Sequence, residues 1–386
     1  MSAQVQERSR TRRSAPFLVL GAAVVIAIVI AVVAGGGGGS NGGSTAATGS
    51  NDGLAAARAV AEKASTRPTK LGLETPIGKP VPAGKKVAFI SCGVEACQIQ
   101  GDIIKQGASD LGWTASTIST DGSPEQLQNA FSSALRQGAD AVIINAVNRA
   151  AVAKQIQEAK QKGVAFVTAS SVEKTGDGIL ANIADTSNSG KIGEKLAAQI
   201  VADSGAKANT LYVNISAFQI LKALGDQFQS SYKGYCASCK YASLDIPAAS
   251  LGKDAPDRIV SYLRSHPQVN YVVLSVSNAL GAGLPAALRA AGLSDKVKIV
   301  GQSGDTQTFK DLQAKNFNSV VPFDYYAVDY LMLDALARHF AGVPQQHANP
   351  PLWIVKPDDV PAEATKGLFP VDVNYRAEFK KLWGKQ

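Results

Sequence analysis

From residue 87 onward, short apolar runs alternate with amphipathic segments. The runs Val87–Ser91 and Ala141–Ala146 are rich in β-branched and apolar residues, which is typical of strands buried on both faces of a sheet. The segments between such runs, for example 98–111, carry apolar residues at helical spacing, and several end at a glycine. This alternation predicts parallel strands covered by helices on both sides.

The pattern restarts at residue 210, so the body is expected to be two similar α/β lobes in tandem. We predict strands at 87–91, 114–119, 141–145, 165–170, 179–184, 210–215, 241–245, 271–276, 298–302 and 319–323. We predict helices at 98–111, 123–137, 150–162, 186–203, 218–233, 256–265, 281–291 and 326–341.

The N-terminal region has a different pattern. Four arginines between residues 8 and 13 precede the unbroken apolar run Phe17–Ala34 and the glycine tract Gly35–Gly39. The run is long enough to cross a bilayer, which favours an uncleaved anchor, although Val32–Ala34 also suits cleavage of a signal peptide after Ala34. In either case the arginines stay cytoplasmic and the body is exported. Residues 35–84 are predicted to be a flexible linker that contains a short helix, Leu54–Ser65.

Composition narrows the possible functions. Hydrophobic residues make up 45% of the chain and charged residues 18%, which is a globular balance. The net charge of +8 is scattered and has no basic stretch interleaved with aromatic residues, so a nucleic-acid partner is not expected. The three histidines, His266, His339 and His347, lie in late helices or the tail, which weakens histidine-based catalysis and a metal site.

The four cysteines form two close pairs, Cys92 with Cys97 and Cys236 with Cys239. In an oxidising compartment such pairs become local disulfides, and that is the interpretation preferred here. A zinc site and a redox-active Cys236–Cys239 motif are the alternatives. The long spacing between the pairs argues against zinc, and the position of the second pair after a helix argues against redox chemistry.

Ligands of open α/β sheets collect outside the carboxyl ends of the strands, so the strand-end loops supply the candidate site. These loops are rich in Ser, Asn, Gln and aromatic residues, which suits a cleft for a small polar or aromatic solute. The candidate ligand-binding residues are Ser91, Glu95, Asn145, Ser170, Ser171, Phe218, Gln219, Ser277, Asn278, Ser303, Asp305, Phe323 and Tyr325.

Several candidates have a structural alternative. Asn145 and Asp305 can cap the helices that follow them, and Ser170–Ser171 can form a turn. Phe323 and Tyr325 can simply pack on a strand. The segment Gly281–Ala286 is similar to a dinucleotide-binding turn, but four residues separate it from the strand, which favours a helix-entry turn.

Six segments together resemble the ribose/galactose-type periplasmic binding proteins, the substrate-capturing subunits of ABC importers, over about Lys85–Gly342. They are KKVAFIS, QGASDLGW, QGADAVIINAVN, FVTASS, IADTSNSGKIGEKLAAQI and VKIVGQSGD. The resemblance implies a type I periplasmic-binding-protein fold of two Rossmann-like lobes with parallel sheets, joined by a three-segment hinge. The N-terminal lobe is then expected at 85–185 and 324–346, and the C-terminal lobe at 186–323 and 347–386.

The departures from the sugar-binding pattern bear on the ligand. The first-strand loop is Ser91–Cys97, Ser170–Ser171 stands where Asp-Arg is frequent, and Ser303 stands where aspartate is frequent. A charged clamp for sugar hydroxyls is thus largely missing, so a less polar or aromatic solute is expected as an alternative to a sugar. Regulators that share this fold need an N-terminal helix-turn-helix, which the apolar run replaces.

The resemblance implies a monomeric, non-catalytic, extracytoplasmic protein without cofactor or metal. It would be membrane-anchored or secreted, and would close on a small solute and deliver it to an ABC permease. The first alternative is a ligand-sensing module for a membrane signalling partner. The second is an envelope enzyme with a nucleotide site at Gly281–Ala286 and Asp305.

Overall fold

The computed structural model describes residues 48–91 and 95–385, with the backbone alone for 48–51 and 95–96. The predicted membrane segment Phe17–Ala34 lies outside these residues. Among the residues that are described, no helix combines the length and apolar character needed to cross a membrane. The described residues belong to one compact unit.

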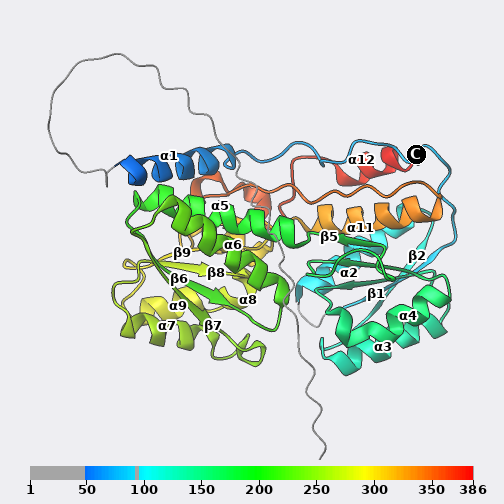
Figure 1. The fold of residues 1–386 in the computed structure, drawn as a ribbon, viewed down its shortest axis with the longest axis horizontal. Coiled ribbons are helices and arrows are strands. Elements are labelled where there is room, and N and C mark those ends of the chain that lie inside the picture. The colour runs from blue at the N-terminus through cyan, green and yellow to red at the C-terminus, as the bar shows by residue number, and fades with distance from the viewer. Residues whose placement is uncertain (1–47, 92–94, 386) are drawn as a thin grey trace, which may run out of the picture. The chain divides into compact units, whose positions relative to one another are not determined.

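The first lobe is built on a parallel sheet in the order β2-β1-β3-β4-β5. Its strands are β1 (Lys86–Ile90), β2 (Thr114–Ile118), β3 (Ala141–Asn145), β4 (Ala165–Ala169) and β5 (Ala181–Ile183). In register, Val87 lies between Ala115 and Ala141. One face is covered by α2 (Glu95–Asp110) and α11 (Tyr325–Phe340), and the other by α3 (Pro124–Arg136) and α4 (Ala153–Gln161) (Figure 1).

The second lobe repeats this plan in a parallel sheet of order β10-β9-β8-β6-β7. Its strands are β6 (Asn209–Asn214), β7 (Lys240–Asp245), β8 (Tyr271–Leu274), β9 (Lys298–Gln302) and β10 (Ser319–Val321). Helices α5 (Thr186–Ser204) and α6 (Gln219–Tyr235) cover one face. The remaining helices are α7 (Ala255–Ser265), α8 (Ser277–Gly281), α9 (Leu284–Ala290) and α10 (Thr306–Gln313). The two predicted α/β lobes are therefore confirmed.

The predicted helix 281–291 begins too early, because residue 281 is the last residue of α8 and the next helix, α9, starts at Leu284. Gly283 stands between them with φ +77°, a conformation that favours glycine, and Pro285 lies in the first turn of α9. Gly281 is required by packing, since a Cβ there would come within 2.7 Å of the Phe317 ring. The small residues of this segment thus serve a turn between two short helices.

The chain passes between the lobes after β5, after β10 and again in its C-terminal part. The first and third passages are tied together: Asn349 donates from Nδ2 to Asp185 Oδ1 at 3.3 Å, and Asn188 donates to the Pro350 carbonyl at 3.1 Å. Asp185 also caps α5 by accepting from the Ser187 N–H at 3.0 Å. These contacts fix the passages beside the start of α5.

The C-terminal strap (residues 343–385) contacts both lobes. Val355 pairs with Val320 of β10 through two backbone bonds of 2.8 and 2.9 Å. Farther on, α12 (Tyr375–Leu382) packs against α2 and α11 of the first lobe. The expected division of the chain placed all of 347–386 with the second lobe, whereas this segment is shared between the two.

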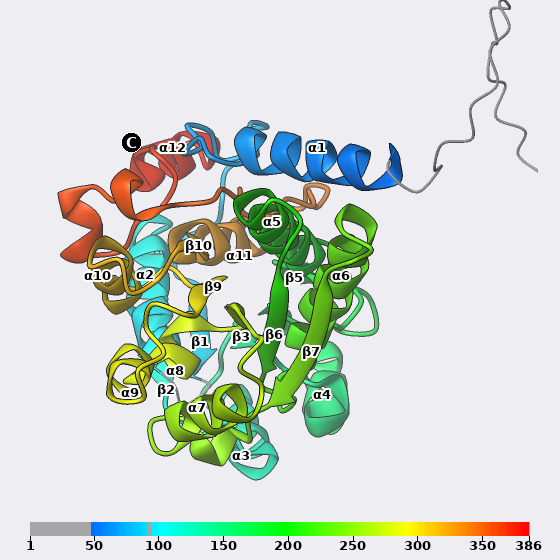
Figure 2. The ribbon, with the colours of Figure 1, turned by 90° about the vertical axis from the view of Figure 1, so that its left-hand side faces the viewer.

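The N-terminal strap (residues 48–84) runs beside it, and Figures 1 and 2 show the two along the same edge. Its helix α1 (Thr48–Lys63) packs on α5 and α6 of the second lobe. A Cβ on Gly53 would lie 2.4 Å from the Tyr235 carbonyl oxygen, so only glycine allows this approach. Beyond the helix, the Ile77 N–H donates to the Leu382 carbonyl at 2.9 Å, and Trp113 Nε1 donates to the Pro82 carbonyl at 2.7 Å. The predicted short helix is confirmed, and the strap reaches from one lobe to the other.

Helix α11 carries three buried aspartates. Asp324 caps the helix through the Ala327 N–H at 2.9 Å and also accepts from the Tyr375 hydroxyl. Asp334 accepts from Arg338 Nε at 2.6 Å and from Trp383 Nε1 at 3.0 Å. Two of the three carboxylates therefore hold the C-terminal strap on the first lobe. The third, Asp329, accepts a hydrogen bond from Gln100.

Candidate functional site

A cavity of about 170 Å³ lies at the carboxyl ends of strands from both sheets. This is the location at which open α/β sheets collect ligands. Its lining comprises Cys97, Gln100, Asn145, Ala146, Ser170, Ser189, Ile192, Ile215, Phe218, Ile220, Leu221, Leu224, Leu251, Val276, Asn278, Ala279, Gln302, Ser303, Phe323 and Tyr325. None of these described lining residues carries a charge. The volume is close to that of a cavity known to hold one benzene-sized ring, about 150 Å³.

The first-lobe wall is formed where strands β3 and β4 end in unusual backbone conformations. Ala146 and Ser170, directly after these strands, have φ values of +53° and +51°. Ala184, after β5, has φ +52°. Residues with a side chain disfavour this region by about 1–2 kcal/mol each, and such strain clusters at functional sites. The strained ends bring Ala146 and Ser170 to the cavity.

Unpartnered amide groups face this cavity from both lobes. Asn145, at the end of β3, is 6% exposed, and neither its Oδ1 nor its Nδ2 has a hydrogen-bond partner among the described residues. From the second lobe, Asn278 Oδ1 and Gln302 Oε1 are buried and also lack one. Gln302 is oriented by its Nε2, which donates to the Ser275 carbonyl at 2.8 Å. Buried polar groups normally have partners, so these amides are available to a ligand.

Gln100 of α2 is held in place from behind the cavity. Its Nε2 donates to Asp329 Oδ1 at 3.0 Å, and the second carboxyl oxygen of Asp329 has no partner among the described residues. Burial raises the pKa of Asp329 well above its usual range, the Gln100 bond lowers it, and the charge of Asp324 adds to the rise. The buried carboxyl of Asp329 thus orients Gln100 from a position outside the lining.

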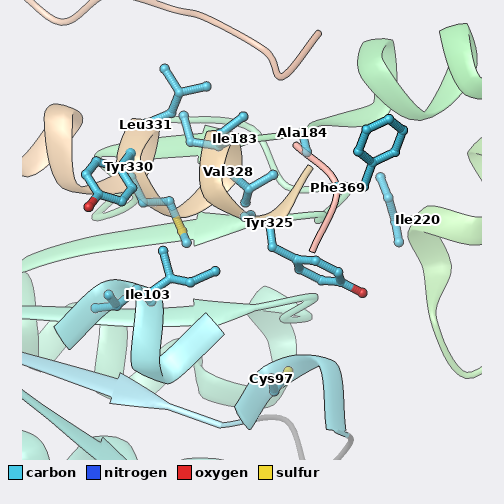
Figure 3. Close-up of a cluster of buried hydrophobic side chains, with 14 of the residues drawn as sticks. Cys97, Ile103, Ile183, Ala184, Ile220, Tyr325, Val328, Tyr330, Leu331 and Phe369 are labelled. Carbon is cyan, nitrogen blue, oxygen red and sulfur yellow. The ribbon is translucent and has the colours of Figure 1, made fainter. Parts of the chain in front are cut away.

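Two aromatic residues lie where the chain passes from β10 into α11. Phe323 and Tyr325 meet edge to face, with ring centroids 5.2 Å apart and an interplanar angle of 68°. Figure 3 shows Tyr325 projecting from the first turn of α11 toward the space bordered by Cys97 and Ile220. Both residues therefore line the cavity at a point where the chain passes between the lobes.

One wall of the cavity is apolar and comes mainly from α5, α6 and the end of β6. Its side chains are Ile192, Ile215, Ile220, Leu221, Leu224 and Leu251. Ile215 is fully buried and Ile192 and Leu224 nearly so, whereas Leu251 is half-buried. This wall belongs to the second lobe alone.

The structure brings together many of the residues predicted from the strand-end loops. Those that line the cavity are Asn145, Ser170, Phe218, Asn278, Ser303, Phe323 and Tyr325. Those that do not line it are Ser91, Ser171, Gln219, Ser277 and Asp305. The side chain of Glu95 lies outside what the structure describes.

Three of the residues outside the lining have identifiable structural roles. Ser171 Oγ donates to the Val147 carbonyl at 2.8 Å and so closes a turn. Ser277 packs against Gly301, where a Cβ would come within 2.2 Å of the Ser277 Oγ. Asp305 caps α10 through the Thr308 N–H at 3.0 Å, which is the capping alternative.

The predicted set omitted Gln100, Gln302 and the apolar wall. Gln302 directly precedes the predicted Ser303, so counting the last strand residue as well as the loop would have included it. Gln100 and the apolar residues of α6 lie on helices, and their spacing there is that of any core-facing helix. No sequence signal distinguishes a helix face that lines a cavity from one that lines a core.

The remaining predictions concern cysteines, metal and nucleotide. Cys236 and Cys239 form a disulfide, as predicted. Cys92 lies outside the described residues, so its bond to Cys97 stays a prediction. Within the described part of the chain, no three or more His, Cys, Asp or Glu side chains gather to hold a metal ion. At Gly281–Ala286 the break between α8 and α9 leaves no long helix N-terminus for phosphate.

Comparison with known families gives one match, which covers more than half of the chain. Residues 96–343 match the periplasmic binding protein domain. No curated protein sequence matches the chain closely enough to count as a relative.

Solved structures share the fold at low sequence identity. An ABC sugar transporter subunit from Rhodobacter sphaeroides 2.4.1 is 19% identical with a TM-score of 0.63, covering 72% of this chain and 99% of its own. The 5-methylthioribose transporter solute binding protein from Thermotoga lettingae TMO, in complex with 5-methylthioribose, is 20% identical with a TM-score of 0.64, covering 78% and 100%. The fructose binding periplasmic domain of the hybrid two component system BT1754 is 17% identical with a TM-score of 0.63, covering 72% and 92%.

Proposed function

Because the chain belongs to the periplasmic binding protein domain family, whose members bind solutes and are not enzymes, we propose that it captures a small organic solute outside the cytoplasm and delivers it to an ABC permease. The observation that supports this most is the interlobe cavity with buried amide atoms that have no hydrogen-bond partner among the described residues. Such amides are costly in an empty site and favourable when a ligand bonds to them.

The proposed mechanism is closure of the two lobes on the solute. Both lobes contribute polar groups to one cavity, Asn145 from the first and Asn278 and Gln302 from the second. A ligand that forms hydrogen bonds with the polar groups of both lobes binds the closed arrangement more tightly than the open one, and so it favours closure. The closed form would then be what the permease recognises. The protein would act as a monomer, anchored in or secreted across the membrane.

The solute is proposed to be uncharged and either sugar-like or less polar. Among the structural neighbours are an ABC sugar transporter subunit and a 5-methylthioribose binding protein. The described lining of this cavity offers amides, hydroxyls and aromatic rings but no charged side chain. The carboxylate of Asp305 is engaged in capping α10.

A second candidate function is ligand sensing. One neighbour is the fructose binding periplasmic domain of a hybrid two component system, so the same fold also serves reception. A neighbouring permease and ATPase gene would favour import, and a neighbouring histidine kinase or chemoreceptor gene would favour sensing.

The proposal is tested by thermal unfolding of the purified chain with sugars, polyols, amino acids, aromatic acids, steroids and nucleotides. Saturable stabilisation by a neutral solute that is recovered unchanged is expected, and a solute at 100 times its Kd stabilises by about 2.7 kcal/mol. Stabilisation by nucleotides alone would overturn it.

Two variants test whether the cavity is the site. Asn145→Leu removes both unpartnered amide atoms in a side chain of similar size, so it should abolish binding while leaving the ligand-free protein at least as stable. Gln219→Ala changes an exposed residue outside the lining and should leave the affinity unchanged. Equal affinity in Asn145→Leu and wild type would place the site elsewhere.

A further inference from the structure

The cavity changes character along the second sheet, whose order is β10-β9-β8-β6-β7. Gln302 and Ser303 at the end of β9 are polar, and after β8 the polar Asn278 stands beside the apolar Val276 and Ala279. Ile215 after β6 and Leu251 after β7 are apolar. The polar residues come after β9 and β8, and the apolar residues come after β6 and β7, which lie farther along the sheet. The two groups therefore occupy different ends of one cavity.

Helices α5 and α6 complete the apolar end. Ile192 comes from the first half of α5, and Ile220, Leu221 and Leu224 come from the first half of α6, two helices that pack closely together. Ser189 of α5 is the polar residue at the edge of this group. A wall of branched aliphatic side chains cannot return the hydrogen bonds that a sugar hydroxyl or a charged group loses on leaving water.

The polar end is suited to hydrogen-bond donors on the ligand. Within the described part of the chain, Asn278 Oδ1 and Gln302 Oε1 are acceptors without a partner, and Asn145 offers an acceptor and a donor. The Gln302 amide is oriented by its bond to the Ser275 carbonyl, so its oxygen is the free atom. Hydroxyl or N–H groups without a formal charge match this set.

From these two ends we infer that the solute has two parts: an uncharged head bearing hydroxyl or N–H donors, and an alkyl or aryl substituent that lies against Ile192, Ile220 and Leu251. This inference rests on the proposed function. The cavity volume of about 170 Å³ limits the whole to about one ring with a short substituent.

The test compares matched solutes that differ in the apolar part alone. Isothermal titration of the purified chain would use D-ribose against 5-methylthio-D-ribose, and D-glucose against its methyl and propyl β-glucosides. Within a pair that binds, the substituted member should bind more tightly by roughly fourfold for each methylene buried. Lysine, glutamate and benzoate serve as charged comparisons and should not bind.

Variants locate the substituent. Leu251→Asn and Leu251→Ala should bring the substituted and parent solutes to within about twofold of each other, because Leu251 is half-buried and lines the apolar end. Leu293→Asn is the matched control, since Leu293 is a half-buried leucine of the same lobe outside the lining, and it should keep the preference.

The outcomes separate this inference from the proposed function. Tighter binding of substituted solutes, lost in the Leu251 variants and kept in Leu293→Asn, supports both. Parent sugars that bind as tightly as their derivatives overturn the inference and leave solute capture standing. A preference unchanged by Leu251→Ala overturns the placement of the substituent, charged solutes that bind overturn the uncharged head, and no binding by any neutral solute overturns both proposals.

Discussion

The two lobes have the same strand order but present different surfaces to the cavity they share. The first lobe contributes strained strand ends at Ala146 and Ser170, and Gln100 held by a buried aspartate. The second contributes Asn278 and Gln302 beside a wall of aliphatic side chains, and no strand of its sheet ends in a positive-φ residue among those described. The same strand order therefore does not give the two lobes the same kind of side chains where they line the cavity.

The lobes also differ in what holds the straps. On the first lobe, Trp383 is bonded to a buried carboxylate and stacks on Tyr330, with centroids 5.8 Å apart. On the second lobe, Trp353 meets Phe369 of the same strap edge to face at 6.0 Å, and Phe369 in turn meets Phe309 of α10 at 5.1 Å. Trp353 Nε1 has no partner among the described residues. Trp383, which is held by a hydrogen bond, can thus be compared with Trp353, which is held by apolar packing, in two tryptophans of similar burial.

The largest expected difference is between Trp383→Phe and Trp353→Phe. Both tryptophans are 1–2% exposed, so the two substitutions remove similar apolar volume. Trp383→Phe also leaves Asp334 Oδ1 without its donor, which should make it less stable by a further ~1–3 kcal/mol. Urea denaturation of both variants measures the difference, and equal losses would show that the Asp334 bond contributes nothing.

A smaller difference is expected from Asp329→Asn, and it depends on pH. Burial raises the pKa of Asp329 above its ordinary 3.8, so the folded protein keeps a proton that the unfolded chain has released. The stability contributed by Asp329 is therefore complete below pH 3.8 and falls as pH rises toward the folded-state pKa. Asparagine resembles the protonated acid and can keep the Gln100 bond.

The variant should accordingly gain stability relative to wild type as pH rises from 4 to 8. Urea midpoints at several pH values between these limits would show a growing separation. A separation that is constant with pH would mean that Asp329 has no raised pKa. Asp324, whose charge contributes to the raised pKa of Asp329, is present in both proteins.

The smallest expected difference is in the sign of the stability change when alanine is replaced by glycine in the first-lobe wall and in the second-lobe wall. Ala146→Gly relieves a φ of +53° and should stabilise by ~0.5–1 kcal/mol after the entropy of glycine is counted. Ala279→Gly lies in α8 and should destabilise by ~0.5–1 kcal/mol. Both alanines are half-buried and line the cavity, so their thermal midpoints can be compared directly. Thermal midpoints that shift in the same direction in both variants would contradict the backbone strain assigned to Ala146.

The sequence predicts the fold well because the determinants are local and repeated. Apolar runs such as 141–145 become buried central strands, and helices end close to the predicted glycines. The break at Gly283 was missed because apolar spacing continues across it. Helix α12 was missed because it has only 8 residues, too few to show a clear apolar pattern, and because it follows an irregular segment.

The site is predicted in part, for a physical reason. Strand-end loops are identifiable from chain order, so Asn145, Asn278 and Ser303 could be named. Whether a loop side chain faces the cavity depends on its local bonds, as Ser171 and Asp305 show. The aliphatic wall depends on how α5 and α6 pack, which residue spacing alone does not determine.

The two straps also bear on affinity. Each contacts both lobes, through α1 and the Pro82 carbonyl in one case and through Val355 and Trp383 in the other. A rotation of one lobe against the other must therefore deform chain that lies largely outside the matched family region, 96–343. The measured Kd of a binding protein is its intrinsic value divided by the fraction of molecules in the competent arrangement. Two proteins with identical cavities and different straps would bind the same solute with different apparent affinities.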